Sequence, residues 1–98
     1  MINEDVIIRL MGEFFEKGRA DPRLAPIHIS LYLALLHLWF VNGQHTLIVF
    51  SYEVMPICKI SASSTYHRVI RELCNYGYLN YEASFNHSKG SRVWFEPL

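Results

Sequence analysis

The sequence is poor in the residues that carry catalysis, bind metals or form cross-links. It has two cysteines, Cys58 and Cys74, whose spacing matches no metal site, and its five histidines are scattered. We find no Ser-His-Asp, Cys-His or paired-carboxylate pattern and no phosphate-binding loop. We therefore expect no enzyme, no cofactor and no metal. We also expect the two thiols to be buried and apolar rather than a redox pair.

The sequence also lacks signals for export and for membrane insertion. Its first ten residues, MINEDVIIRL, are acidic where a secretory signal is basic. The longest apolar run, residues 31–41, is too short to span a bilayer. It contains His37, which we expect in the core or in an interface. The sequence thus predicts a cytoplasmic protein with no membrane partner.

Charge is scarce and unevenly placed. Charged residues make up 18% of the chain and the net charge is zero, which argues mildly against a nucleic-acid binder. Residues 1–58 carry four basic and six acidic side chains, a net charge of −2. Residues 59–98 carry five basic and three acidic side chains, a net charge of +2. This asymmetry favours one basic face in the second half of the chain.

The first half of the chain predicts two helices. With 51% hydrophobic residues in 98, the chain suits one small domain with a true core. Apolar residues at steps of three and four predict a helix over residues 3–17, with Asn3 as N-cap and Gly18 as the stop. A connector containing two prolines follows, and we expect it to break any helix. Residues 30–41 are apolar all round, which predicts a buried central helix ended by Asn42-Gly43.

The second half predicts a strand, two helices and a hairpin. Residues 46–50 are β-branched and aromatic, typical of a strand. Ser51 is the expected N-cap of a short helix that reaches about residue 57, limited by Pro56. A longer helix is expected from about residue 61 to 76, with Gly77 as its C′ residue. Its apolar back would be Tyr66, Ile70, Leu73 and Gly77, and its polar front Ser64, His67, Arg68, Arg71 and Asn75. Residues 78–84 and 92–96 alternate as strands, separated by turn residues, and predict a hairpin.

The stretch from Ser63 to Tyr81, SSTYHRVIRELCNYGYLNY, resembles the winged helix-turn-helix family of bacterial DNA-binding regulators. The short helix, the turn at residues 58–61 and the longer helix match the helix-turn-helix plan, and the hairpin stands where that family has its wing. The resemblance covers residues 30–95. It implies an α+β fold, a three-helix core with a β-hairpin wing, to which this chain adds an N-terminal helix. Residues 1–29 would form that helix and its connector, and residues 30–98 the DNA-binding domain.

The resemblance implies a recognition helix over residues 61–76 in the major groove, and a wing over residues 84–92 on the DNA backbone or in the minor groove. The expected DNA-binding residues are Lys59, Ser63, Ser64, Thr65, His67, Arg68, Arg71, Lys89 and Arg92. Arg68 is favoured for base readout, because arginine can bridge guanine O6 and N7. Alternatively, Ser61 or Ser63 caps the helix, and the cations at the tip (His87 to Arg92) only keep the hairpin soluble.

The N-terminal helix offers a possible dimer interface, since many small DNA binders pair to read two half-sites. The expected contacts are Ile7, Leu10, Met11, Phe14 and Phe15, with Leu31 or Tyr32 helping. The alternative is that this helix packs on its own chain. With the wing ending near residue 98, we expect no ligand-sensing domain and no small-molecule ligand.

The function that these patterns favour is sequence-specific binding of double-stranded DNA by a small transcriptional regulator. We expect this regulator to be a homodimer. In size and layout it loosely resembles accessory regulators of bacterial mobile elements. One alternative is a winged-helix protein-interaction module, which would depend on exposed apolar residues such as Trp94 or Phe14. The other is a replication or recombination accessory factor with the same DNA-binding face.

Overall fold

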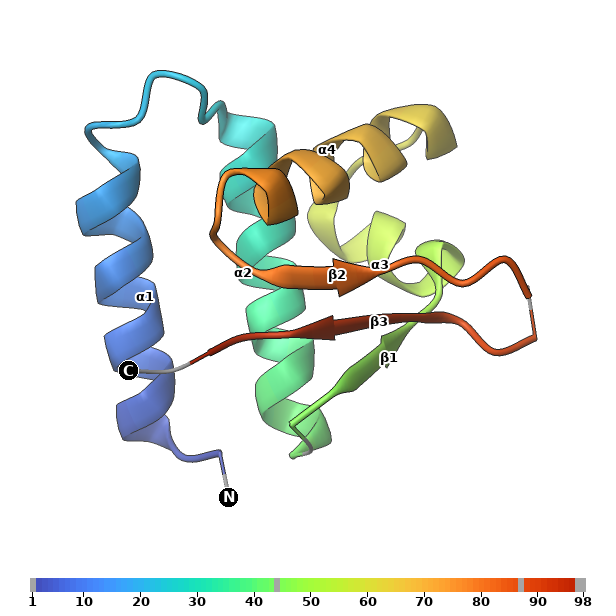
Figure 1. The fold of residues 1–98 in the computed structure, drawn as a ribbon, viewed down its shortest axis with the longest axis horizontal. Coiled ribbons are helices and arrows are strands. Elements are labelled where there is room, and N and C mark those ends of the chain that lie inside the picture. The colour runs from blue at the N-terminus through green and yellow to red at the C-terminus, as the bar shows by residue number, and fades with distance from the viewer. Residues whose placement is uncertain (1, 44, 87, 97–98) are drawn as a thin grey trace.

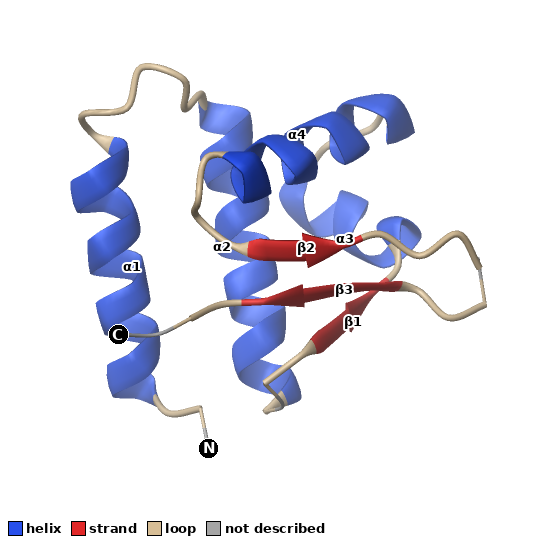
Figure 2. Cartoon of the chain, viewed as in Figure 1, coloured by secondary structure: helices blue, strands red, loops and turns tan. Residues whose placement is uncertain are grey.

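Four helices and a three-stranded antiparallel sheet make up the fold, which confirms the predicted α+β class for the part of the chain described (Figures 1 and 2). This computed structural model describes residues 2–43, 45–86 and 88–96. The elements, in chain order, are α1 (Glu4–Gly18), α2 (Pro26–Asn42), β1 (Leu47–Val49), α3 (Ser51–Cys58), α4 (Ser63–Asn75), β2 (Asn80–Glu82) and β3 (Ser91–Trp94).

Helix α1 begins and ends close to where its sequence predicts. The side chain of Asn3 accepts a hydrogen bond from the Val6 N–H at 3.1 Å, as an N-cap does. Gly18 is the last helical residue, and a Cβ on it would lie 2.7 Å from Cδ1 of Leu24. Glycine is therefore needed there because the connector folds closely over the end of the helix.

Helix α2 is the buried centre of the molecule, and it starts four residues earlier than predicted. Pro26 does not break this helix but occupies its first turn, where a missing N–H removes no helical hydrogen bond. Leu31, Leu35 and Trp39 are fully buried along it. The helix ends at Gly43, whose φ of 73° lies in the left-handed region, as the Asn-Gly pair predicts.

The three strands pair in the order β1-β3-β2, so that β3 is central (Figure 2). Val93 on β3 is buried and lies opposite both Leu47 and Tyr81. The predicted hairpin between the last two strands is confirmed, but all three strands are shorter than predicted. Beyond Glu82 the Ser84 N–H donates to the Ser91 side-chain oxygen at 3.2 Å instead of to a backbone carbonyl, so the ladder stops.

Helix α3 differs from its prediction at both ends. Ser51 is its first residue, and the N-cap is Phe50, which cannot cap through its side chain, so the predicted Ser51 cap is wrong. The helix continues two residues past Pro56 and ends at Lys59, which adopts a φ of 62°. Pro56 removes the hydrogen bond to the carbonyl of Tyr52, an exposed residue, and the helix continues past it.

Helix α4 starts two residues later than predicted and ends as predicted. Gly77, with a φ of 86°, donates its N–H to the Cys74 carbonyl at 3.0 Å, and Tyr78 donates to the Leu73 carbonyl at 3.0 Å. This pair of bonds is a Schellman motif. It turns the chain from α4 directly into β2, which fixes the hairpin against the helix.

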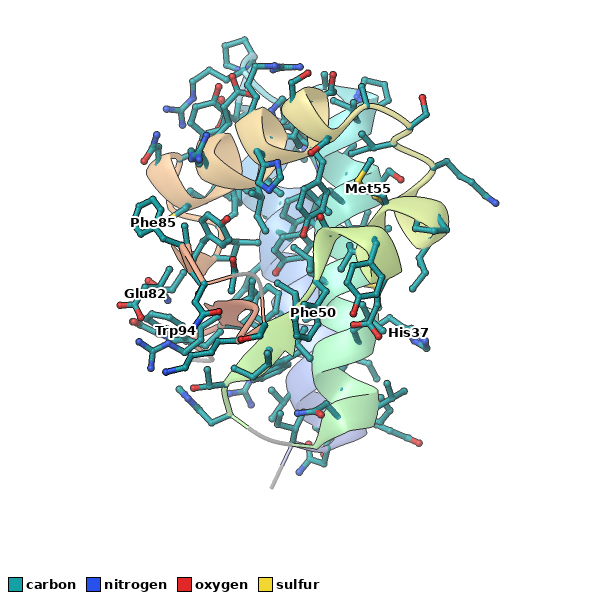
Figure 3. The ribbon with its side chains drawn as sticks, turned by 90° about the vertical axis from the view of Figure 1, so that its right-hand side faces the viewer. His37, Phe50, Met55, Glu82, Phe85 and Trp94 are labelled. Carbon is teal, nitrogen blue, oxygen red and sulfur yellow. The ribbon has the colours of Figure 1, made fainter. Side chains whose placement is uncertain are left out.

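Three expectations about single side chains have different outcomes. Cys58 is buried as predicted, whereas Cys74 is only half-buried, and neither forms a disulfide. His37 is exposed on α2 rather than in the core (Figure 3).

In the described part of the chain, no helix combines the length and the apolar character needed to cross a bilayer.

Candidate nucleic-acid interface

Helix α4 has the two-faced character that its sequence predicts. Tyr66, Ile70 and Leu73 are buried on its inner side together with Val69. Ser63, Ser64, Arg68, Arg71 and Asn75 are exposed on its outer side, and Thr65 and His67 are half-buried. The exposed side chains of α4 therefore form a polar front on the surface of the described chain.

The start of α4 has no side-chain cap, so the alternative that Ser61 or Ser63 caps it is wrong. Ala62 is the N-cap residue. Ser63 lies one position later, with its hydroxyl 3.3 Å from Nδ1 of His67, and that same nitrogen donates to the Ser63 carbonyl at 2.8 Å. The first N–H groups of α4 thus keep no side-chain acceptor, and they lie at the positive end of the helix dipole.

A groove of about 320 Å³ separates the starts of α3 and α4 from the hairpin loop. Four serines line it: Ser51, Ser63, Ser84 and Ser91. Figure 3 views the molecule from the side on which the hairpin, α3 and the start of α4 all face the reader. The walls are rich in hydroxyl groups and carry no carboxylate, which suits the sugar–phosphate backbone of DNA.

Arg68 is held by a network that reaches into the core. Its Nη1 donates to Oε1 of Glu72 at 2.8 Å, and Nε2 of His28 donates to the same oxygen at 2.8 Å. The Ala25 N–H donates to Nδ1 of His28 at 3.0 Å, which places the imidazole proton on Nε2. His28 is only 4% exposed. The hydrogen bond from His28, reinforced by the nearby Arg68 charge, lowers the pKa of Glu72 and keeps it ionised.

The hairpin carries the cations predicted for the wing, Lys89 in its loop and Arg92 on β3. Arg92 pairs with Glu82 on the facing strand, whereas Lys89 is exposed. The Asn86 side chain accepts hydrogen bonds from the Ser88 N–H at 3.0 Å and the Ser88 hydroxyl at 2.7 Å, so the loop is ordered by its own side chains. His87, also predicted at the tip, lies outside the described residues.

Two further predicted cations lie on the surface. Lys59 is exposed at the junction of α3 and α4, and Arg71 is exposed on α4. Within residues 2–43, 45–86 and 88–96, neither of them, nor Lys89, forms an ion pair. No carboxylate of the described residues compensates these three charges, whereas Arg68 and Arg92 each contact one.

The residues expected in a dimer interface lie mostly on the chain's own core. Leu10 and Phe14 are buried against α2, and Ile7 and Met11 are half-buried beside them. Phe15 is 44% exposed. Leu31 and Tyr32, which were expected to help, are both buried inside the molecule. Only the outer edge of α1 is left for a second copy.

Sequence reasoning missed three features of this surface. Glu72 stands four residues after Arg68, a spacing that indicates a helical ion pair and could have been noticed. No sequence signal pairs Glu72 with His28, because the two are 44 residues apart. Tyr66 was assigned to the apolar back, yet it also lines the groove.

Comparison of the chain with protein-family models, with curated proteins and with solved structures found no match. In the described residues, no group of three histidine, cysteine or acidic side chains is placed to hold a metal ion. The geometry of this surface is therefore the basis for inferring a function.

Proposed function

We propose that the protein is a winged helix-turn-helix protein that binds double-stranded DNA sequence-specifically and acts as a small transcriptional regulator. The observation that carries the proposal is the shared orientation of two elements. The start of α4, through Ser63 and His67, and the hairpin loop, through Asn86 and Gly90, line one groove, so a single duplex could contact both. Helix α4 would enter the major groove, and the hairpin would act as the wing.

Affinity and specificity would come from different residues. Lys59, Arg71 and Lys89 have no ion pair to break among the described residues, so each can neutralise a phosphate and release a counterion. Arg68 would select a base by exchanging the Glu72 carboxylate for guanine O6 and N7. Ser63, Ser64, Thr65 and His67 at the start of α4 would contact bases or phosphates beside it, and Arg92 would contact the backbone from the wing.

Fluorescence anisotropy with a random-sequence duplex across a salt series tests this proposal. We expect dissociation constants of about 1–100 μM that weaken steeply with salt. The double variant Arg71→Ala plus Lys89→Ala should lower the slope of log K against log salt by about 0.9 for each lost phosphate contact. Arg19→Ala removes the same kind of charge from the end of α1, outside the groove and α4, and should change little. Absence of binding even at low salt would overturn the proposal.

A homodimer would let the protein read two half-sites. Because Leu10 and Phe14 pack inside the chain, a dimer through α1 would use Phe15 together with its exposed neighbour Ile8. Light scattering at micromolar concentration should give twice the monomer mass, and Phe15→Asp should reduce it to the monomer. A monomer mass for the wild-type protein would remove the dimer from the proposal.

One observation favours the second candidate, a protein-interaction module. Phe85 in the hairpin loop is 98% exposed and Tyr52 on α3 is 70% exposed, whereas Phe14, expected to serve such a module, is buried. Trp94 is half-buried. The same anisotropy assay separates the two functions, because a module that binds through Phe85 and Tyr52 shows no salt-dependent affinity for DNA.

A further inference from the structure

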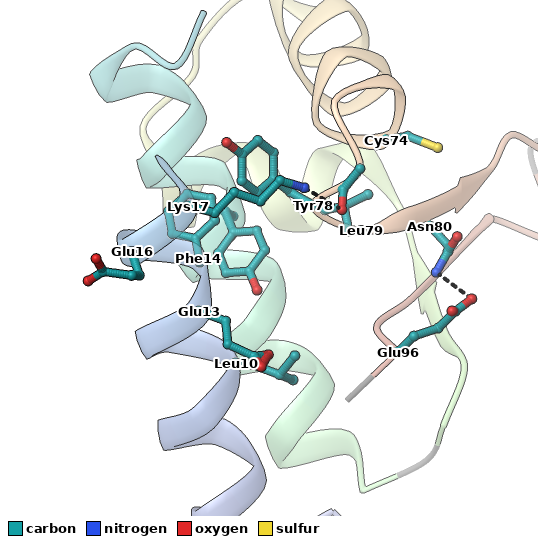
Figure 4. Close-up of a pocket in the computed structure, with 12 residues that line it drawn as sticks. Leu10, Glu13, Phe14, Glu16, Lys17, Cys74, Tyr78, Leu79, Asn80 and Glu96 are labelled. Carbon is teal, nitrogen blue, oxygen red and sulfur yellow. Dashed lines mark hydrogen bonds between the residues drawn. The ribbon is translucent and has the colours of Figure 1, made fainter. Parts of the chain in front are cut away.

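A second cavity lies on another part of the molecule, between α1 and the segment that leads from the end of α4 into β2 (Figure 4). Its volume is about 660 Å³. This is within the range of about 300–1,000 Å³ typical of small-molecule sites. None of the predicted DNA-binding residues lines it.

The floor of this cavity is aromatic. The rings of Phe14 and Tyr32 stack with their centroids 3.8 Å apart, and Tyr78 meets Phe14 edge to face at 5.2 Å. Leu10 and Leu79 extend the apolar surface on either side. Such a floor accommodates a hydrocarbon or aromatic body.

Tyr32, a buried residue, brings its hydroxyl to the same cavity. The residue is 2% exposed, and its hydroxyl makes no hydrogen bond within the described part of the chain. Burial, and next the negative charge of Glu13, raise the pKa of Tyr32, so the hydroxyl stays protonated at neutral pH. Because no buried side-chain oxygen or nitrogen of the described residues lacks a partner, this unpaired hydroxyl is open to the cavity, where a bound molecule can hydrogen-bond to it.

The charged side chains that line the cavity are mostly acidic. Glu13, Glu16 and Glu96 are carboxylates, and the single cation is Lys17. The Lys17 ammonium is already engaged: it lies 3.5 Å from the carbonyl oxygens of Tyr76 and Gly77 and 4.6 Å from the centroid of the Tyr78 ring (Figure 4).

Two further features make the electrostatic potential inside the cavity more negative. Oε1 of Glu96 accepts from the Asn80 amide at 3.2 Å, which orients that carboxylate across the cavity from α1 (Figure 4). The end of α4, where the helix dipole is negative, forms part of the wall through Cys74 and Gly77. The combined field favours a positively charged occupant.

We propose that this cavity binds a small organic cation, a primary ammonium group on a short aromatic or aliphatic body. The body lies on Phe14 and Leu79, and the ammonium group faces Glu13 and hydrogen-bonds to the Tyr32 hydroxyl. This site is separate from the proposed DNA-binding surface and does not depend on it.

Nuclear magnetic resonance titration of the full chain with phenethylamine tests the proposal, with 2-phenylethanol and phenylacetate as matched neutral and anionic probes. We expect saturable shifts at residues around the cavity with phenethylamine. The alcohol should bind about tenfold more weakly and the carboxylate not at all, because the charge-assisted hydrogen bond is lost. The shifts should leave the start of α4 unaffected.

Isosteric variants show which groups hold the probe. Glu13→Gln and Tyr32→Phe should each weaken phenethylamine binding several-fold. Glu53→Gln, an exposed carboxylate on α3 that does not line the cavity, should leave it unchanged. Tyr32→Phe should also leave the free energy of unfolding unchanged, since its hydroxyl has no partner among the described residues.

Cys74 provides a second measurement, because it lines the cavity and is only half-buried. Cys58 is buried, and burial raises the pKa of its thiol, so iodoacetamide should label Cys74 first. At equal concentration, phenethylamine should slow this labelling more than 2-phenylethanol does. Equal shifts with the amine and the alcohol would overturn the role of charge. No shifts with any probe would mean that the cavity holds only water, whether or not the protein binds DNA.

Discussion

At the scale of the residue, Glu72 has the most consequential position on the candidate interface. One carboxylate oxygen accepts from both the buried His28 and the exposed Arg68, so it links the N-terminal turn of α2 to the front of α4. The link orients the arginine, but it also competes with DNA for the same guanidinium. Stability and DNA affinity should therefore respond to this residue in opposite directions.

Glu72→Ala tests this opposition. The free energy of unfolding should fall by about 1–3 kcal/mol, because the buried imidazole N–H loses its acceptor. DNA affinity of the folded variant should rise about two- to fivefold, the equivalent of one exposed ion pair released. Urea denaturation and anisotropy measure the two effects. Glu53→Ala removes the same charge from α3 without freeing an arginine, and an equal rise in that control would contradict the competition.

Asp21 sets an acid-sensitive contact at the connector. Its carboxylate accepts from the Arg23 backbone and guanidinium and from the Tyr78 hydroxyl at 2.7 Å, and these bonds, those of Arg23 first, lower its pKa. Burial, and next the Asp21 contact, raise the pKa of Tyr78 to about 12.

A lowered pKa in the folded state fixes the sign of the pH effect. The contribution of Asp21 to stability is present above its ordinary value of 3.8 and is lost as the pH falls further. Wild-type urea midpoints should therefore drop below about pH 4, and those of Asp21→Asn should drop less steeply. Tyr78→Phe should lie between them. Parallel acid profiles for all three proteins would contradict this assignment.

At the scale of the element, the hairpin loop depends on one glycine. Gly90 has a φ of 70°, and a Cβ there would lie 2.9 Å from Cγ2 of Ile48 and 3.0 Å from the carbonyl oxygen of Val49. The loop that carries Lys89 thus packs directly on β1. Gly43, with a φ of 73°, has open space around the equivalent Cβ position.

These two glycines form a matched pair. Gly43→Ala should destabilise the protein by about 1–2 kcal/mol through left-handed backbone strain alone. Gly90→Ala adds steric overlap and should destabilise it by about 2–4 kcal/mol. It should also weaken DNA binding by displacing the loop, whereas Gly43→Ala should not. Equal effects of the two variants on stability and affinity would show that the loop does not need close packing.

At the scale of the whole molecule, an aromatic cluster joins α1 to the rest of the fold. Phe14 stacks on Tyr32 of α2 and meets Tyr78 at the entry to β2, so three distant parts of the chain share one contact. Phe15, the next residue, points largely to solvent.

Phe14→Ala should therefore lower the free energy of unfolding by about 3–5 kcal/mol. Phe15→Ala should change it by only about 0.5 kcal/mol, as surface substitutions do. Chemical denaturation of both variants measures the difference. Similar losses would indicate that α1 buries its other side, as it would in a dimer, and light scattering on the same samples would then be decisive.

The sequence by itself determined the local features of this protein. Asn3, Gly43 and Gly77 mark helix ends through bonds made within one turn. The alternation of apolar and polar residues determined which face of α4 is buried and which residues pair as a hairpin. Such features are predictable because they depend on the conformational preferences of neighbouring residues and on a period of 3.6 or 2.

Only the tertiary structure decided which distant residues contact one another. It placed His28 beside Glu72, made Pro26 a helix start rather than a break, and turned Leu10 and Phe14 towards the chain's own core. It also formed the cavity between α1 and β2. These features join residues far apart in the chain. Their contacts depend on how helices and strands pack, and the hydrogen-bond partner of a buried side chain is settled only when that packing is complete.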